Sequence, residues 1–173
     1  MSELKRIFQI SIPLILICIV SGATLALSFD LTEERIREVE ERKINESLSS
    51  IFPDASFRET GDYYTVLVNG EEIGYAFMAE GQGYSSRIKT MVGMYQNGTL
   101  SRIYVISQLE TPGLGTRITE PEFTNQFSGK RIEDLRLSRD GGLIDSITGA
   151  TISSRAITEI VRARAEVIRN ETR

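Results

Sequence analysis

The chain has 173 residues, with 24 acidic and 20 basic side chains and a formal net charge of −4 at pH 7. It contains no histidine, which excludes haem held by histidine and metal sites built on imidazole. Its one cysteine, Cys18, lies in an apolar segment, so disulfides and iron–sulfur clusters elsewhere are excluded, and no metal site is predicted. The acidic balance excludes nucleic-acid binding, which needs a positively charged surface. Any electron transfer by this chain must therefore use an organic cofactor.

Residues 7–29 contain no charged side chain, and about 20 apolar residues are enough to cross a lipid bilayer. Lys5 and Arg6 precede this segment and acidic residues follow it, which predicts a cytoplasmic tip over residues 1–6. A cleaved signal peptide is the alternative. The apolar run is longer than the usual signal core of about 7–15 residues, which favours an uncleaved anchor in the cell membrane. Everything after Asp30 is then extracytoplasmic, with 23 acidic and 18 basic residues and a net charge of −5.

A stalk helix is predicted over residues 30–53. Asp30 followed by Glu33 is typical of a helix start, and Pro53 ends the pattern. Apolar residues recur between them at helical spacing, and we expect this stripe to pack on the following domain. The stripe consists of Ile36, Val39, Ile44, Leu48 and Ile51.

Residues 54–173 are predicted to form one α+β domain. Strands over 63–68 and 72–77 flank Asn69-Gly70, which is typical of a hairpin with a type I′ turn. A second strand pair is predicted over 88–95 and 103–107. A short helix is expected over 120–127 and an amphipathic helix at the end of the chain, where arginines form its solvated face. The predicted fold is an antiparallel sheet flanked by helices, preceded by a single transmembrane helix and the stalk.

Three glycine-rich segments, at 80–86, 110–115 and 145–151, lie between these elements. Glycine allows the backbone to approach a ligand closely and to adopt conformations that other residues avoid. The second segment reads Glu110-Thr111-Pro112-Gly113-Leu114-Gly115 and is predicted to form a turn. An ordinary connecting turn is the alternative for each segment taken alone.

The third segment leads into the C-terminal helix, where Thr148-Gly149-Ala150-Thr151 is followed by Ile152 and Ser153. Backbone N–H groups at a helix start are unpaired and the helix dipole favours negative charge, so a phosphate at Thr151 would be stabilised. A helix cap is the alternative, with Asp145 as a turn-forming residue. Ser21-Gly22-Ala23-Thr24 matches the same tetrad inside the apolar segment, where no such ligand could reach it, so we interpret that copy as a coincidence.

The segment 148–153 resembles the signature Ser/Thr-Gly-Ala-Thr-x-Ser/Thr of the FMN-binding domain family. Residues 110–115 resemble the segment of that family that lies beside the flavin ring, and residues 81–84 resemble a preceding glycine–tyrosine segment more weakly. From Tyr63 to Ile168 the chain resembles the G subunit of Rnf electron-transport complexes. It is also similar to the C subunit of sodium-translocating NADH:quinone reductases.

This resemblance implies FMN bound covalently to Thr151 through a phosphoester, attached by a flavin transferase with FAD as donor. It also implies that the partners are the other subunits of a membrane-bound Rnf-type complex that translocates ions. The chain would carry electrons without a catalytic residue or a complete substrate site of its own. The alternatives are a sensory or regulatory flavoprotein and a non-redox assembly subunit. Tyr84, Thr111 and Leu114 are the expected ring contacts, and the remaining residues of the predicted FMN site are Thr148, Gly149, Ala150, Ser153, Glu110, Gly113 and Gly115.

Overall fold

The computed structural model describes residues 2–172, with the side chains of residues 11–29 and 31–172. It divides into two compact units at the boundary between Arg42 and Lys43. The first unit consists of most of one long helix, and the second contains the end of that helix and all other elements.

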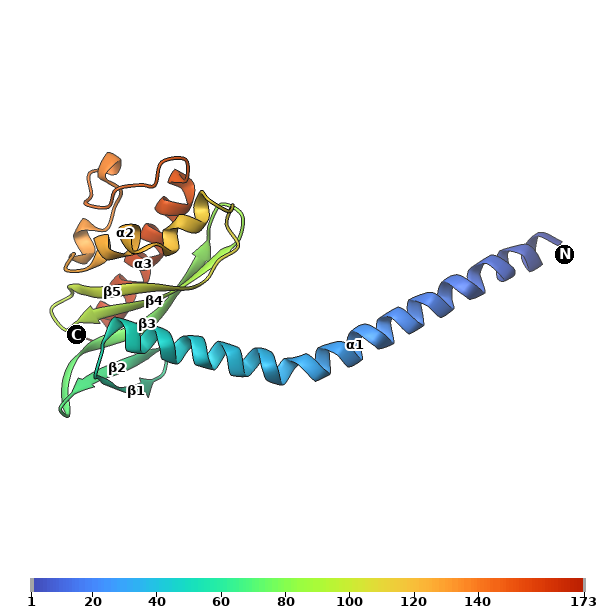
Figure 1. The fold of residues 1–173 in the computed structure, drawn as a ribbon, viewed down its shortest axis with the longest axis horizontal. Coiled ribbons are helices and arrows are strands. Elements are labelled where there is room, and N and C mark those ends of the chain that lie inside the picture. Colours follow the sequence, from blue (N-terminus) through green and yellow to red (C-terminus); the bar gives the residue numbers. More distant parts are fainter. Residues whose placement is uncertain (1, 173) are drawn as a thin grey trace. The chain divides into compact units, whose positions relative to one another are not determined.

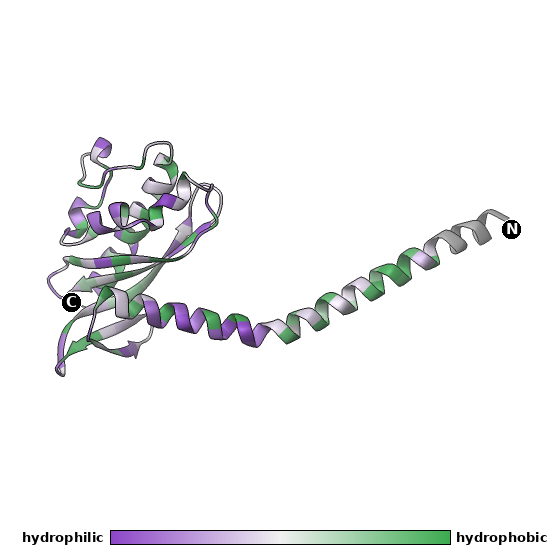
Figure 2. Ribbon diagram, in the orientation of Figure 1, coloured by the Kyte–Doolittle hydropathy of each residue, from purple (hydrophilic) through white to green (hydrophobic). Residues whose placement is uncertain are grey.

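Helix α1 (Ser2–Ile51) passes through the predicted anchor and the predicted stalk without interruption. The predicted helix start at Asp30 is wrong, because neither proline nor glycine breaks the chain there and backbone hydrogen bonding continues. Figure 2 shows the change along α1 from an apolar segment to a hydrophilic one. Among the described residues, this helix is the one element long and apolar enough to cross a membrane. The predicted tip over residues 1–6 begins at Met1, which lies outside the described residues.

The second unit contains a five-stranded antiparallel sheet whose strands follow one another in chain order (Figure 1). Its strands are β1 (Ser56–Thr60), β2 (Tyr63–Val68), β3 (Glu71–Gln82), β4 (Arg87–Tyr95) and β5 (Leu100–Ser107). Both predicted hairpins are confirmed. In the first turn Asn69 and Gly70 have φ angles of 53° and 84°, as a type I′ turn requires.

Two details of the sheet differ from the prediction. Strand β3 continues to Gln82, so the predicted loop over 80–86 is reduced to residues 83–86. Residues 80–82 pair with β4 through their backbone, and their glycine does not prevent it. Strand β1 was not predicted, because Phe57 is its only large apolar residue and the alternation is therefore invisible. The register with β2 and the packing of Phe57 hold β1 at the edge of the sheet.

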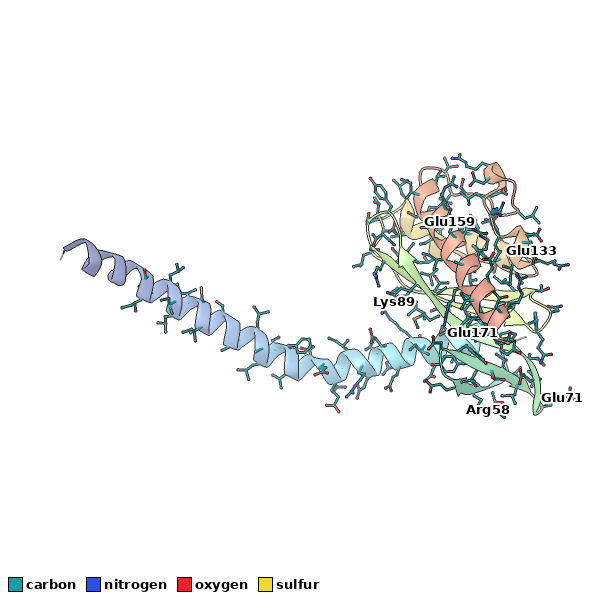
Figure 3. The ribbon with its side chains drawn as sticks, turned by 180° about the vertical axis from the view of Figure 1, so that it is seen from behind. Arg58, Glu71, Lys89, Glu133, Glu159 and Glu171 are labelled. Carbon is teal, nitrogen blue, oxygen red and sulfur yellow. The ribbon has the colours of Figure 1, made fainter. Side chains whose placement is uncertain are left out.

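One face of the sheet packs against helix α3 (Thr151–Glu171) and the segment that connects β5 to it. Its core contains Phe77 and Val92 from the strands and Ile157, Val161 and Ile168 from α3, all fully buried. Charged side chains such as Arg58, Glu71 and Glu159 lie on the exposed surface of the unit (Figure 3). The amphipathic C-terminal helix is thus confirmed.

The opposite face of the sheet receives the last turns of α1. Leu48 and Ile51 are buried there against Val66, Ala76 and Met91. The end of the helix is hydrogen-bonded to β5, because Ser101 Oγ donates to the carbonyl of Ile51 at 3.0 Å. Of the predicted stripe, Ile44, Leu48 and Ile51 lie in this unit and pack on the sheet, whereas Ile36 and Val39 belong to the first unit.

The segment between β5 and α3 contains little regular structure but supplies much of the core. The predicted helix over 120–127 divides into α2 (Pro121–Thr124) and a 3₁₀ turn, η2 (Asn125–Phe127). The other turns are η1 (Gly115–Thr119), η3 (Ile132–Asp134) and η4 (Ser138–Asp140). Their apolar residues are buried against the sheet and α3, and they are Ile118, Phe123, Phe127, Ile132, Leu135, Leu137 and Ile144.

The arginines of α3 do not form a simple solvated face. Arg155 pairs with Asp140, Arg164 with Asp62 and Arg169 with Glu133. Their side chains are 25–40% exposed, so packing covers their apolar stems while the charged ends meet acidic groups. The pairs with Asp140 and Glu133 join the connecting segment to the helix, and the pair with Asp62 joins the turn between β1 and β2 to it.

Candidate functional site

A cavity of about 550 Å³ opens where the start of α3 meets two of the glycine-rich segments. Most of the predicted site residues lie together around it. Its lining consists of Tyr84, Thr111, Leu114, Gly115, Gly149, Ala150, Thr151, Ile152 and Ser153. The residues come from positions up to 69 apart in the chain, and the fold brings them to one place.

The floor of this cavity is the first turn of α3. Ala150 occupies the N-cap position and provides no side-chain hydrogen bond to the helix. Within the described chain, the backbone N–H groups of the next three residues, 151–153, have no acceptor. These three groups and the positive end of the helix dipole favour a bound anion such as phosphate. The Thr151 side chain, itself without a hydrogen bond in the described chain, lies beside them.

Three apolar side chains around the cavity are exposed, namely Tyr84, Leu114 and Ile152. Leu114 approaches the turn before α3, because a Cβ atom on Gly149 would lie 3.1 Å from Leu114 Cδ2. Gly149 has a φ of 81°, a conformation that side chains disfavour. Apolar side chains beside unpaired backbone donors provide what a planar ring with a phosphate tail requires.

Glu110 lies behind the wall of the cavity and is only 4% exposed. Its carboxylate accepts hydrogen bonds from the backbone N–H groups of Tyr84, Ser85 and Ser86 at 3.2, 3.0 and 3.1 Å. The hydroxyl of Ser153, in the first turn of α3, donates to the same carboxylate at 2.5 Å. Glu110 therefore joins the turn after β3, its own loop and the helix start.

Burial opposes ionisation of Glu110, but the hydrogen bonds from Ser153 and from the backbone of residues 84–86 outweigh it and lower the pKa of this carboxyl. The group is therefore ionised at neutral pH. Because the lowered pKa is that of the folded state, the carboxylate contributes stability above the pKa of an unfolded glutamate. That contribution is lost as the pH falls through the folded pKa.

Two glycines make room for this carboxylate. A Cβ atom on Gly83 would lie 2.6 Å from Glu110 Oε1, and one on Gly115 would lie 2.7 Å from Glu110 Cβ. Gly115 is therefore required by close packing. Gly113, by contrast, has a φ of 74° and open space around it, and it does not line the cavity. Glycine is favoured at position 113 because of this positive φ angle and not because of its small size.

Thr148 also lies apart from the cavity. It lines a smaller polar hollow of about 220 Å³, together with Arg117, Gln126 and Asp145. Asp145 is fixed there, since its carboxylate accepts a hydrogen bond from Ser138 Oγ at 2.6 Å and its N–H donates to Gln126 Oε1 at 2.7 Å. These contacts join Asp145 to two other segments, and its carboxylate has no hydrogen bond to its own turn in the described chain.

Ile152 lines the cavity and was not predicted as a site residue. The signal that would have found it is an apolar residue exposed in the first turn of an amphipathic helix.

Thr24 lies within α1, where its hydroxyl donates to the carbonyl of Val20 at 2.8 Å. The second copy of the tetrad is therefore helix rather than a turn before a helix.

Residues 83–166 match the FMN-binding domain family, and these residues include the whole lining of the cavity. The G subunit of the ion-translocating oxidoreductase complex of Methanosarcina acetivorans is 30% identical to this chain, and the match covers 97% of each. The chain belongs to the G-subunit family of ion-translocating oxidoreductase complexes. In Clostridium ljungdahlii, the G subunit of the proton-translocating ferredoxin:NAD(+) oxidoreductase complex is 28% identical over 95% of this chain and 92% of its own.

Two solved structures share the fold of this G-subunit protein. The C subunit of the sodium-translocating NADH-quinone reductase of Parabacteroides distasonis superposes with a TM-score of 0.51 at 24% identity. That match covers 62% of this chain and 60% of the other. NqrC of Shewanella oneidensis superposes with a TM-score of 0.54 at 18% identity, over 69% of each chain. The α+β architecture is thus shared with these two proteins.

Proposed function

We propose that this protein is a membrane-anchored electron carrier with FMN attached to Thr151 through a phosphoester. The observation that carries the proposal is the position of Thr151: it lies in the cavity, in the first turn of α3, beside three backbone N–H groups that have no acceptor in the described chain. The segment matched to the FMN-binding domain family contains this residue. The chain would exchange electrons with neighbouring subunits of an Rnf-type complex, as its membership of the G-subunit family suggests.

The residues present fit FMN in two respects. The N–H groups at the start of α3 would hold the phosphate, and Thr148, Gly149 and Ala150 form the turn that exposes them. The side chains of Tyr84, Leu114 and Ile152 would contact the flavin ring, with Thr111 beside them. When bound, FMN supplies the capacity to accept and donate electrons, which no side chain of this protein provides.

Attachment requires a separate enzyme. No carboxylate, amine or guanidinium group lines the cavity in the described chain, so nothing there activates the Thr151 hydroxyl as a nucleophile. We propose that a flavin transferase joins the Thr151 oxygen to the FMN phosphorus of FAD. The bond between the two phosphates of FAD breaks, AMP leaves, and the hydroxyl proton is lost. A covalent bond keeps the flavin in place whatever its concentration outside the cell.

Mass spectrometry of the protein purified from membranes tests this proposal. Co-expression with a flavin transferase should give a mass increment equal to FMN less one water, localised to a peptide that contains Thr151. Without the transferase the protein should be colourless and of unmodified mass. An unmodified protein under both conditions would contradict covalent attachment. Co-purification with membrane redox subunits would favour electron transfer over a sensory role.

The orientation of the anchor is a further expectation. Lys5 and Arg6 precede the apolar segment of α1 and acidic residues follow it, which predicts that the FMN-binding domain is extracytoplasmic. Protease added to right-side-out vesicles should digest the domain and leave the anchor protected. Digestion only in inverted vesicles would reverse the orientation, and a mature protein that begins near Phe29 would show a cleaved signal.

A further inference from the structure

We propose that Glu110 is a positioning residue that fixes both walls of the cavity before any flavin is attached. The inference rests on the proposed function for the identity of the ligand, but not for the contacts themselves. Glu110 does not line the cavity. It acts through residues that do, because its carboxylate holds the segment that carries Tyr84 and, through Ser153, the first turn of α3.

Both carboxylate oxygens accept hydrogen bonds from the turn at 83–86, and one of them also accepts from the first turn of α3. Oε1 accepts the N–H groups of Ser85 and Ser86, and the hydroxyl of Ser86 lies 3.4 Å away. Oε2 accepts the N–H of Tyr84 and the hydroxyl of Ser153. The Ser86 hydroxyl also accepts the N–H of Leu109 at 2.7 Å. These hydrogen bonds therefore join the turn at 83–86 to Leu109 and Glu110, at the start of the next loop.

The turn at 83–86 depends on this carboxylate for its conformation. Its one internal backbone bond joins the N–H of Gly83 to the carbonyl of Ser86 at 2.7 Å, and its next three N–H groups all donate to Glu110. Tyr84 is 63% exposed, so packing alone does not hold its side chain at the cavity. Without the acceptor, the three amides would turn toward water and the position of Tyr84 would no longer be fixed.

Only a glutamate satisfies this arrangement. Glutamine offers one acceptor oxygen, and its amide group would present N–H donors to the N–H and O–H donors that now face the second oxygen. Aspartate is shorter by one methylene. Gly83 and Gly115 lie against the carboxylate and its stem, which leaves little room for a different side chain to adjust. The charge and length of Glu110 are therefore both matched to its partners.

Hydrogen exchange on the full-length, flavin-free protein tests the inference directly. In Glu110→Gln the backbone amides of residues 84–86 should exchange faster than in the wild type, by about tenfold or more at those that lose their acceptor oxygen, because a hydrogen bond to a charged acceptor contributes that much protection. After co-expression with the transferase, the flavin of the variant should be more accessible to a soluble quencher such as iodide. Its midpoint potential should shift.

Glu133→Gln is the matched control. Glu133 does not line the cavity; it pairs with Arg169 and Arg131, and these contacts hold its pKa below the usual value. This variant should leave exchange at 84–86, quenching and potential unchanged. If Glu110 had a purely structural role, Glu110→Gln would lower the melting temperature but would leave iodide quenching and the midpoint potential of the flavin unchanged.

Unchanged exchange at 84–86 in Glu110→Gln would overturn the inference. Faster exchange in a protein that never acquires flavin would support the positioning role and refute the proposed function, so the two failures are distinguishable. If Glu110→Gln does not fold, Ser153→Ala replaces it. Loss of this one donor should raise exchange at Tyr84 several-fold, and no change there would overturn the inference.

Discussion

Replacement of Thr151 by alanine should abolish covalent flavin and leave the domain folded. The Thr151 hydroxyl makes no hydrogen bond within the described chain, and alanine is a better helix former than threonine. The change therefore removes the attachment oxygen without removing a structural contact. Intact-mass measurement and the flavin signal of the denatured protein would report the loss, which should be complete.

Two other threonines serve as controls for this variant. Thr148→Ala changes the exposed start of the same tetrad, and Thr24→Ala changes the copy inside α1. Both should retain flavin, Thr24→Ala at the wild-type level and Thr148→Ala at least in part. Thr151→Ser keeps an oxygen at the same position and should restore some attachment. Flavin that remains on Thr151→Ala after denaturation would place the bond elsewhere.

Replacement of Gly93 by valine should strongly destabilise the second unit. Gly93 lies on β4 opposite the end of α1, and a Cβ atom there would lie 2.7 Å from Phe52 Cε2 and closer still to Ile51 Cγ2. Both neighbours are almost fully buried, so they cannot move aside without loss of packing. Overpacking by a small group lowers the free energy of unfolding by about 1–3 kcal/mol. Valine is larger than alanine, so Gly93→Val should lower it more than Gly93→Ala.

Chemical denaturation of the flavin-loaded protein in detergent measures this effect. Gly93→Ala should lower the free energy of unfolding and Gly93→Val should lower it further. Gly22→Ala is the control, because it makes the same change in α1 with nothing within 4 Å of the new Cβ atom. Equal stability of Gly93→Ala and Gly22→Ala would show that the end of α1 does not pack on β4.

The parts of the fold that could be predicted from the sequence are those specified by local patterns. Asn69-Gly70 indicates a hairpin without reference to the rest of the chain, and the C-terminal helix shows its apolar periodicity directly. Strand β1 has no such signal, because its pairing and the burial of Phe57 are long-range effects. The continuity of α1 past Asp30 is equally hidden, because a sequence typical of a helix start is also compatible with a helix interior.

The candidate site divides in the same way. The loop around Leu114 and the turn at Gly149 were predicted from resemblance to a family, and the structure places them around one cavity. Glu110 was predicted as a residue of the FMN site, but its hydrogen bonds to the neighbouring segments were not, since its partners lie 24 to 43 positions away in the chain. Buried carboxylates of this kind are recognised only by their acceptor geometry. Neither the periodicity nor the composition of the sequence indicates such a group.

The order of the elements has a consequence for how the protein matures. Strands β1 to β5 are joined by short turns, and such local pairing forms quickly during folding. Helix α3 comes last, and its residues Ile157 and Val161 cover the strand residues Phe77 and Val92. The cavity therefore does not exist until helix α3 has been synthesised and has packed on the sheet. A chain interrupted before α3 would keep Tyr84 and Leu114 but would lack the helix start that completes the proposed flavin site.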